Sequence, residues 1–169
     1  YRDDDIIILF LARFTNHKQP LTLIKAFAKA LPQLPNLKLL MVGEGDQKET
    51  ALELVNELKI KESIKFLPFR QDVPNLLAAA DIFVLPSLWE GLPIGLLEAM
   101  SMGKAIIASD VDGTIEIVKN EENGLLIAVA NLETELAAAI VKLGKDRLLR
   151  NRFGTAARET VKNSFNAGK

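Results

Sequence analysis

Short apolar runs recur along the chain and predict the strands of a sheet. Most of these runs are apolar at successive positions rather than at alternate ones, so both faces of each strand must be covered. This pattern is typical of a parallel sheet that is packed under helices. The six predicted strands are Ile6–Ala12, Leu37–Val42, Ile64–Leu67, Ile82–Leu85, Ala105–Ala108 and Leu125–Ile127.

Between these runs, apolar residues recur at helical spacing and charged residues fall on the opposite face. In the first such segment Lys25 and Lys29 are left for water, and Pro32 ends the pattern. The last segment is amphipathic, and its pattern allows one continuous helix or a helix broken near Gly154. The predicted helices are Leu21–Leu31, Gln47–Ile60, Asp72–Ala80, Pro93–Met102, Thr114–Lys119, Asn131–Leu143 and Asp146–Phe165.

The alternation of strands and helices predicts an α/β fold with a doubly wound, six-stranded parallel, Rossmann-like sheet. A length of 169 residues fits a single domain over residues 1–169 and leaves no room for a second substrate domain. Ligands of such sheets bind in the crevice at the carboxyl ends of the strands. We therefore expect a site in the loops after the first, fourth and fifth predicted strands.

Composition and charge restrict the function classes. Hydrophobic residues make up 49% and charged residues 25% of the chain, as in a folded domain, and a net charge of -1 attracts no polyanion. We expect no nucleic-acid partner and interpret the basic side chains of the last helix as a solvated face. No apolar run is long enough to span a bilayer, and the lack of cysteine excludes disulfides and fits a cytoplasmic protein. The chain starts directly before a buried-looking run, as an excised domain or an engineered sequence would.

The segment from Pro86 to Met100 combines a loop and a helix directly after a buried strand. Gly91 and Pro93 flank a sharp entry into this helix, and proline is favoured at the first helical position. Free backbone N–H groups and the positive end of the helix dipole then point at the ligand crevice. The sequence therefore predicts a phosphate-binding socket at the start of this helix.

Two carboxylates belong to the same segment. Glu98 lies in a helix whose other residues, apart from Ser101, are apolar or glycine, so we expect this carboxylate to be buried and hydrogen-bonded. Two interpretations are open: it binds ribose hydroxyls of a ligand, or it caps a backbone group or pairs with a lysine of the protein. Glu90 precedes the socket and is either a neighbour of the group joined to the phosphate or an exposed loop glutamate.

Basic side chains follow the first predicted strand. Arg13 and Lys18 lie on the loop at the carboxyl edge of the sheet, where a guanidinium and an ammonium can clamp a diphosphate. His17, the only histidine, has no second ligand type and no obvious carboxylate near it in the sequence. We interpret it as a loop residue and not as a base or metal ligand.

Two common nucleotide motifs do not fit. The turn Gly43–Gly45 has Lys48 where the third glycine of a dinucleotide fingerprint would stand, which argues against an NAD site. The segment Gly103–Ala105 lacks the hydroxyl residue and the upstream glycine of a P-loop, which argues against a P-loop ATPase.

Taken together, these residues resemble the carboxyl-terminal, donor-binding domain of the group 1, family 4-like retaining glycosyltransferases of GT-B fold. The resemblance covers residues 6–165. Glu90 and Glu98 match the family's two glutamates separated by seven residues, and Arg13 and Lys18 match its basic pair after the first strand. Further matching blocks are Val42–Gly45, Ala79–Ser87 and Glu98–Met100 with Gly103.

The resemblance implies a role for each of these residues. Arg13, Lys18 and Glu90 would be catalytic: the two cations hold the diphosphate, and Glu90 contacts the donor sugar near its anomeric carbon. Glu98 would bind the ribose hydroxyls, and Arg70, after the third strand, would lie at the nucleotide base. The other substrate-binding positions would be Gly43 in the glycine turn and the backbone of Gly91, Leu92, Pro93, Ile94 and Gly95 around the distal phosphate.

The implied reaction passes a hexosyl group from a nucleotide diphosphate sugar to an acceptor hydroxyl with retained anomeric configuration. Cationic side chains and a helix dipole stabilise the departing diphosphate, so no cofactor and no metal is implied. Such enzymes also need an amino-terminal domain for the acceptor. We therefore expect the chain alone to bind a nucleotide diphosphate or its sugar weakly and to turn over little.

Two alternatives stand beside this interpretation. The acceptor site can belong to a separate subunit of a split glycosyltransferase, or the chain can be a non-catalytic binding module or engineered Rossmann-like scaffold. Three departures from the family pattern bear on the loop geometry and on the preference for a donor. Gln19 and Pro93 stand where glycine is common, and Asp112–Glu116 replaces a usual Gly-Gly-x-Pro-Glu run near the expected sugar pocket.

Overall fold

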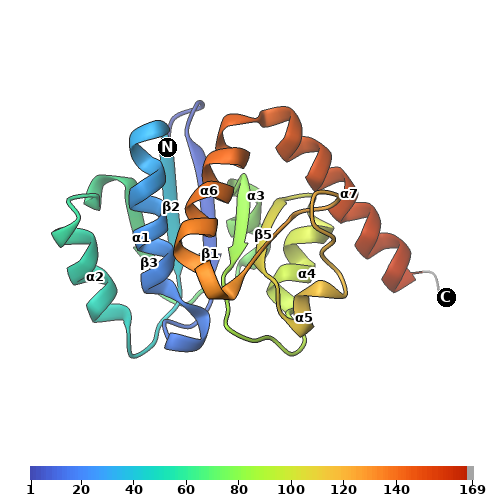
Figure 1. The fold of residues 1–169 in the computed structure, drawn as a ribbon, viewed down its shortest axis with the longest axis horizontal. Coiled ribbons are helices and arrows are strands. Elements are labelled where there is room, and N and C mark those ends of the chain that lie inside the picture. Colours follow the sequence, from blue (N-terminus) through green and yellow to red (C-terminus); the bar gives the residue numbers. More distant parts are fainter. Residues whose placement is uncertain (167–169) are drawn as a thin grey trace.

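Six parallel strands form one sheet in the computed structural model of the chain, which describes residues 1–166. They lie in the order β3-β2-β1-β4-β5-β6, so the predicted doubly wound fold is confirmed (Figure 1). Residues 167–169 of the predicted domain lie outside the described residues. The strands are β1 (Ile6–Leu11), β2 (Leu37–Val42), β3 (Ile64–Leu67), β4 (Ile82–Leu85), β5 (Ala105–Ser109) and β6 (Leu125–Ile127).

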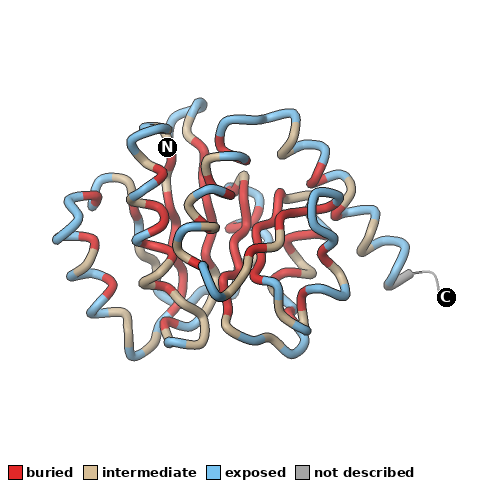
Figure 2. The backbone as a smooth tube through the Cα atoms, viewed as in Figure 1, coloured by how far each residue is buried: buried red, intermediate tan, exposed pale blue. Residues whose placement is uncertain are grey.

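Helices cover both faces of this sheet. Ile8 and Phe10 of β1 pack with α1, α2 and α6, whereas Ile7 and Leu9 pack with α3 and α4 on the other face. Figure 2 shows the strands buried between these layers, which is why successive residues of β1 are apolar. The helices are α1 (Pro20–Ala30), α2 (Lys48–Glu57), α3 (Val73–Ala79), α4 (Ile94–Ser101), α5 (Asp112–Ile115), α6 (Leu132–Lys145) and α7 (Arg147–Asn166). Single turns of 3₁₀ helix are η1 (Asn16–Lys18), η2 (Leu31–Gln33), η3 (Lys61–Ser63) and η4 (Val129–Asn131).

The last helix, α7, is continuous through Gly154 and packs against α4 and β5. A Cβ atom added at Gly154 would lie 2.1 Å from the carbonyl oxygen of Gly103, so no side chain fits between the two backbones. Of the two forms that the sequence allowed, the unbroken one is observed. Gly154 serves close packing and does not interrupt the helix.

Some helix ends differ from the predicted ones. The helix α5 begins at Asp112 and not at Thr114, because the Thr114 hydroxyl accepts from the Val111 N–H and so caps an earlier start. Pro93 is the residue before α4, and the expectation that it takes the first helical position is wrong. The helix α2 ends at Glu57 because Lys59 adopts a left-handed φ of 58°.

The order of the strands reverses between β1 and β4, which pair directly with each other. Their carboxyl ends open at the lower edge of the view in Figure 1, where the predicted site loops lie. Among the described residues, no helix has the length and apolar composition needed to cross a membrane.

Candidate functional site

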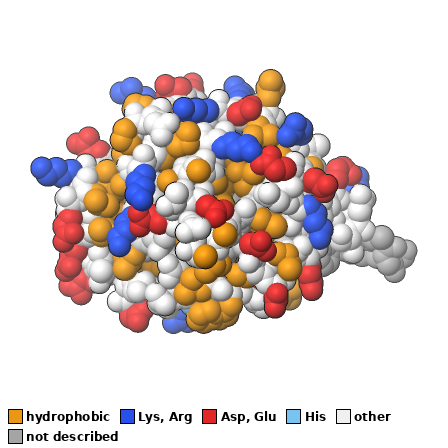
Figure 3. All heavy atoms as spheres, in the orientation of Figure 1, with side chains coloured by type: hydrophobic (Ala, Val, Ile, Leu, Met, Phe, Trp, Pro, Cys, Tyr) orange, Lys and Arg blue, Asp and Glu red, His pale blue; other side chains and the backbone are white. Residues whose placement is uncertain are grey.

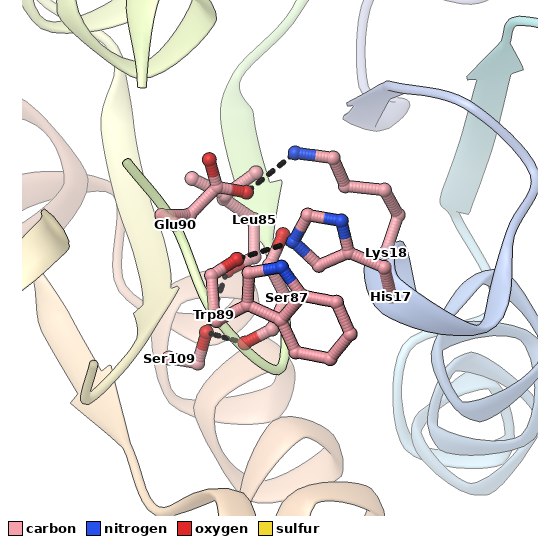
Figure 4. A network of polar contacts seen from close by, with 7 residues as sticks. All are labelled: His17, Lys18, Leu85, Ser87, Trp89, Glu90 and Ser109. Carbon is pink, nitrogen blue, oxygen red and sulfur yellow. Dashed lines mark hydrogen bonds and ion pairs between the residues drawn. The ribbon is translucent and has the colours of Figure 1, made fainter. Parts of the chain in front are cut away.

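An ion pair joins the two loops at this switch point. Lys18 ends η1, after β1, and Glu90 lies in the loop between β4 and α4. The Lys18 Nζ atom lies 2.5 Å from Glu90 Oε2 (Figure 4), and the side chains are 21% and 7% exposed, respectively. The alternative that Glu90 is an exposed loop glutamate is therefore wrong. The fold brings together two of the residues that the sequence predicted to be catalytic.

The residues next to this pair also touch each other. The Nε2 atom of His17 lies 2.5 Å from the carbonyl oxygen of Trp89, and the two rings are stacked with centroids 4.0 Å apart. The sequence indicated only that His17 is a loop residue, and its contacts with Trp89 were not predicted. Trp89 was not predicted at all, and its only signal was an aromatic residue directly before Glu90.

Buried hydroxyl groups hold the Glu90 loop from below. The Ser109 hydroxyl, at the end of β5, donates to the Ser87 carbonyl oxygen (2.5 Å), and the Thr114 hydroxyl donates to the Ser109 carbonyl oxygen (2.5 Å). All three side chains are fully buried. The Ser87 hydroxyl is the buried side-chain polar atom that has no partner within residues 1–166. Sequence reasoning missed this group because each serine or threonine looks ordinary by itself.

The one-turn helix α5 packs closely against the backbone of the same loop. A Cβ atom at Gly113 would lie 2.5 Å from the carbonyl oxygens of both Glu90 and Gly91. Gly113 belongs to the Asp112–Glu116 run, whose departure from the family pattern was noted from the sequence. The glycine is therefore required by the close approach of α5 to the backbone beside Glu90.

The predicted phosphate socket lies at the start of α4. The Ile94 N–H donates to the carbonyl oxygen of Leu92 at 3.0 Å, and the Leu97 N–H donates to that of Pro93 at 3.1 Å. Within the described chain, the N–H of Gly95 has no such partner and stays available at the positive end of the helix. Pro93 has no N–H group, so it cannot donate to a phosphate.

Glu98 is half-buried, and the expectation that α4 buries it fully is wrong. The reason is that α4 is apolar on an exposed side as well, with Ile94 60% exposed. In the part of the chain that the structure describes, the Glu98 carboxylate forms neither a hydrogen bond nor an ion pair. The interpretation that Glu98 caps a backbone group or pairs with a lysine of the protein is therefore not supported.

A small cleft of about 160 Å³ opens at the carboxyl ends of β1 and β2. Arg13, Gly43 and Phe69 line it together. Gly43 has a φ of 145°, and a Cβ atom there would lie 2.0 Å from the Ala12 carbonyl oxygen, which explains the glycine turn. Phe69, 67% exposed, was missed by sequence reasoning, although an aromatic residue beside the predicted Arg70 was its signal.

Arg70 does not line this cleft. Its guanidinium donates to both carboxylate oxygens of Asp72, with Nε 2.7 Å from Oδ1. This side-chain hydrogen bonding lowers the pKa of Asp72 from its ordinary value of 3.8 and raises that of Arg70. In this structure the predicted base-binding residue is thus engaged by the protein itself.

A doubly wound parallel sheet, with an ion pair and a helix start at its switch point, defines a Rossmann-like α/β domain. The model of the family "Glycosyl transferases group 1" matches residues 1–160, and the chain belongs to this family.

Three similar proteins illustrate what the chain matches and how much of each it covers. It is 33% identical, over 98% of its length, to an Escherichia coli UDP-Gal:alpha-D-GlcNAc-diphosphoundecaprenol alpha-1,3-galactosyltransferase, and covers 43% of that protein. The Anabaena protein HepE, solved with UDP and glucose, superposes with a TM-score of 0.89 at 26% identity, over 96% of this chain and 45% of HepE. A crystal structure of the carboxyl-terminal domain of the Francisella tularensis group 1 glycosyl transferase LpcC superposes with a TM-score of 0.87 at 25% identity, over 95% of this chain and 86% of the other. The chain thus spans less than half of the first two relatives and nearly all of the third.

Proposed function

We propose that this chain is the donor-binding domain of a retaining GT-B glycosyltransferase. In this proposal it binds a nucleotide diphosphate sugar, from which a hexosyl group passes to an acceptor hydroxyl. The observation that carries the proposal is the Lys18–Glu90 pair, which brings a cation and a carboxylate together at the switch point of the sheet. HepE, whose structure holds UDP and glucose, supports a donor of this chemical class.

The charges at the site suit the departure of a diphosphate. Negative charge grows on the diphosphate as its bond to the sugar breaks, and fixed cations stabilise that charge without reorganisation. Lys18 and the exposed Arg13 supply the cations, and the available N–H of Gly95 at the start of α4 is suited to the distal phosphate. These groups meet the electrostatic demand of the step, and we propose no metal.

Glu90 belongs on the sugar side of the same step. The anomeric carbon gains positive charge in the transition state of glycosyl transfer, and a carboxylate nearby stabilises it. Because Glu90 is 7% exposed and held by Lys18, its carboxylate is fixed before the donor arrives. Lys18 then serves two anions at once, the carboxylate and the diphosphate.

The remaining groups suit the nucleoside. The half-buried Glu98 carboxylate, which has no partner in the described chain, is suited to accept from the two ribose hydroxyls. The cleft beside Arg13, Gly43 and Phe69 offers an aromatic face and a cation at the next strand end, where a base would lie. Arg70 would reach the base only by leaving Asp72.

We further propose that a second domain covers the site and binds the acceptor. Large apolar side chains remain exposed around the site, with Trp89 58%, Leu92 73% and Ile94 60% exposed. Figure 3 shows hydrophobic side chains gathered at the lower edge, where Figure 1 places the loop after β4. Such a patch is typical of a surface that another protein part covers.

The direct test is calorimetric titration of the chain with UDP, GDP and ADP and their glucose and mannose conjugates. We expect one nucleotide to bind saturably and both Glu98→Ala and Arg13→Ala to weaken it. The control is Lys25→Ala, a charge removal on the exposed face of α1, away from the site. Absence of binding to all three nucleotides at millimolar concentration refutes donor binding by this domain, and equal loss in the Lys25 variant refutes the assignment of the site.

A further inference from the structure

A set of contacts one residue away from Lys18 and Glu90 joins the loops that carry them. The rings of His17 and Trp89 lie parallel within 9°, with centroids 4.0 Å apart, and His17 Nε2 lies 2.5 Å from the Trp89 carbonyl oxygen. The Leu88 N–H donates to the His17 carbonyl oxygen at 2.9 Å. We call the contacts among His17, Leu88 and Trp89 the loop clasp, most of which is visible in Figure 4.

The hydrogen bond in the loop clasp shows which nitrogen of His17 carries a proton. A carbonyl oxygen only accepts hydrogen bonds, so the Nε2 atom of His17 must carry hydrogen and donate. The imidazole therefore makes two different contacts with one residue: its edge binds the backbone of Trp89 and its face covers the indole. Both contacts are made with the residue directly before Glu90.

The clasp contributes little to the hydrophobic core. Trp89 is 58% exposed, and neither ring belongs to the two clusters of buried residues that fill the faces of the sheet. The two loops are already connected to the sheet by β1 and β4, which pair with each other. The clasp is therefore placed to set the separation of the loops rather than to stabilise the fold.

We propose that His17 is a positioning residue of the donor site. By stacking on Trp89 and donating to its carbonyl oxygen, it locks the Glu90 loop onto the Lys18 loop and fixes the ammonium and carboxylate before a ligand arrives. A site whose groups are held in place loses less freedom on binding. The inference rests on the proposed function, because it concerns the same donor site.

Three variants separate the two contacts. His17→Ala removes both, His17→Phe keeps the aromatic face without the donor, and His17→Gln keeps an N–H donor without the aromatic face. Trp89 is the only tryptophan, so its emission spectrum reports directly on the ring above it. Amide hydrogen exchange of residues 86–90 reports on the loop, and titration with UDP, GDP and ADP reports on the site.

We expect His17→Ala to shift the Trp89 emission and to speed amide exchange in residues 86–90 while exchange in the strands is unchanged. The tightest of the three nucleotides should bind about two- to tenfold more weakly, the range that corresponds to one aromatic pair. His17→Phe and His17→Gln should each recover part of that affinity, and Lys25→Ala should equal the wild type.

The outcomes distinguish this inference from the proposed function. Unchanged nucleotide affinity in His17→Ala, with wild-type binding intact, overturns the positioning role and leaves the proposed function standing. Faster exchange throughout the sheet shows a role in folding and also overturns it. A wild-type chain that binds none of the three nucleotides refutes the proposed function, and this inference with it.

Discussion

Lys18 and Glu90 differ in their access to water, so removing one charge should destabilise the fold more than removing the other. Glu90 is 7% exposed and Lys18 is 21% exposed, so removing the ammonium leaves a carboxylate that water scarcely reaches. We expect Lys18→Met to lower the free energy of unfolding by about 3 kcal/mol, as for a broken buried pair. Glu90→Gln keeps an acceptor for an ammonium that water can reach, and should cost about 1 kcal/mol. Urea unfolding measures both.

A second ion pair provides the matched control for that comparison. Lys29 and Glu133 approach to the same 2.5 Å, but their side chains are 54% and 34% exposed. Exposed pairs contribute at most about 1 kcal/mol, so Lys29→Met should cost clearly less than Lys18→Met. Equal costs for the two lysine variants, or a larger cost for Glu90→Gln than for Lys18→Met, would show that burial of Glu90 does not govern the energetics.

Asp72 gives a prediction about pH. Its hydrogen bonds from Arg70 hold its pKa below the ordinary value of 3.8 in the folded chain. A carboxyl whose pKa is lowered by folding contributes stability above its unfolded-state pKa and loses it as the pH falls through the folded value. The contribution of Asp72 should therefore be lost progressively as the pH falls below 3.8. In an NMR titration, Arg70→Ala should raise the pKa of Asp72; an unchanged value would exclude Arg70 as the cause.

Among the elements, α7 contains a glycine, Gly154, at a position where helix propensity favours alanine. Alanine is favoured over glycine within a helix by about 1 kcal/mol, so propensity alone predicts that Gly154→Ala stabilises the chain. The added Cβ atom would lie 2.1 Å from the Gly103 carbonyl oxygen, which forces α7 away from the α4–β5 turn. We expect a net loss of about 2 kcal/mol, within the range for overpacked sites. Thermal unfolding should show a lower midpoint.

The same substitution in α4 is the control. A Cβ atom at Gly95 would meet only Phe83 Cζ, at an ordinary 3.7 Å. Gly95→Ala should therefore leave the midpoint unchanged or raise it slightly. If both variants behave alike, close packing of α7 is not the reason for Gly154.

How much of these elements the sequence reveals depends on the range of the interactions that fix them. The run beginning at Ile6 predicted a strand because burial on two faces leaves its mark in consecutive residues. The burial of Glu90 could not be predicted, because its partner Lys18 lies 72 residues away. For Glu98 the apolar composition of α4 was misleading, since Ile94 beside it is 60% exposed and composition does not say which face is covered. Local pattern thus predicts the elements, while the state of a site residue depends on distant loops.

At the scale of the whole molecule, the exposed apolar side chains are distributed unevenly. Leu92 and Ile94 lie at the carboxyl edge of the sheet, next to the proposed donor site, and are 73% and 60% exposed. Leu148, which is 81% exposed, lies in the first turn of α7. Its neighbours Arg147 and Arg150 line a cavity together with Ala105, at the start of β5. Leu148 therefore lies at the opposite edge of the sheet. If a second domain covers Leu92 and Ile94, replacing them with polar residues should affect the protein only when that domain is present.

This difference gives a prediction that separates the domain from the complete enzyme. In the isolated chain, Leu92→Ser with Ile94→Ser should change the free energy of unfolding by no more than about 0.5 kcal/mol per site, because both side chains are already in water. Nucleotide affinity should persist, since the backbone N–H groups of α4 remain. In an enzyme that joins this domain to its acceptor-binding domain, the same pair should lower transfer activity several-fold, whereas Leu148→Ser should leave both chains unaffected. Equal activity of the paired variant in the joined enzyme would mean that this edge is not the covered surface, because a buried leucine or isoleucine contributes about 1.5–3 kcal/mol when it leaves water.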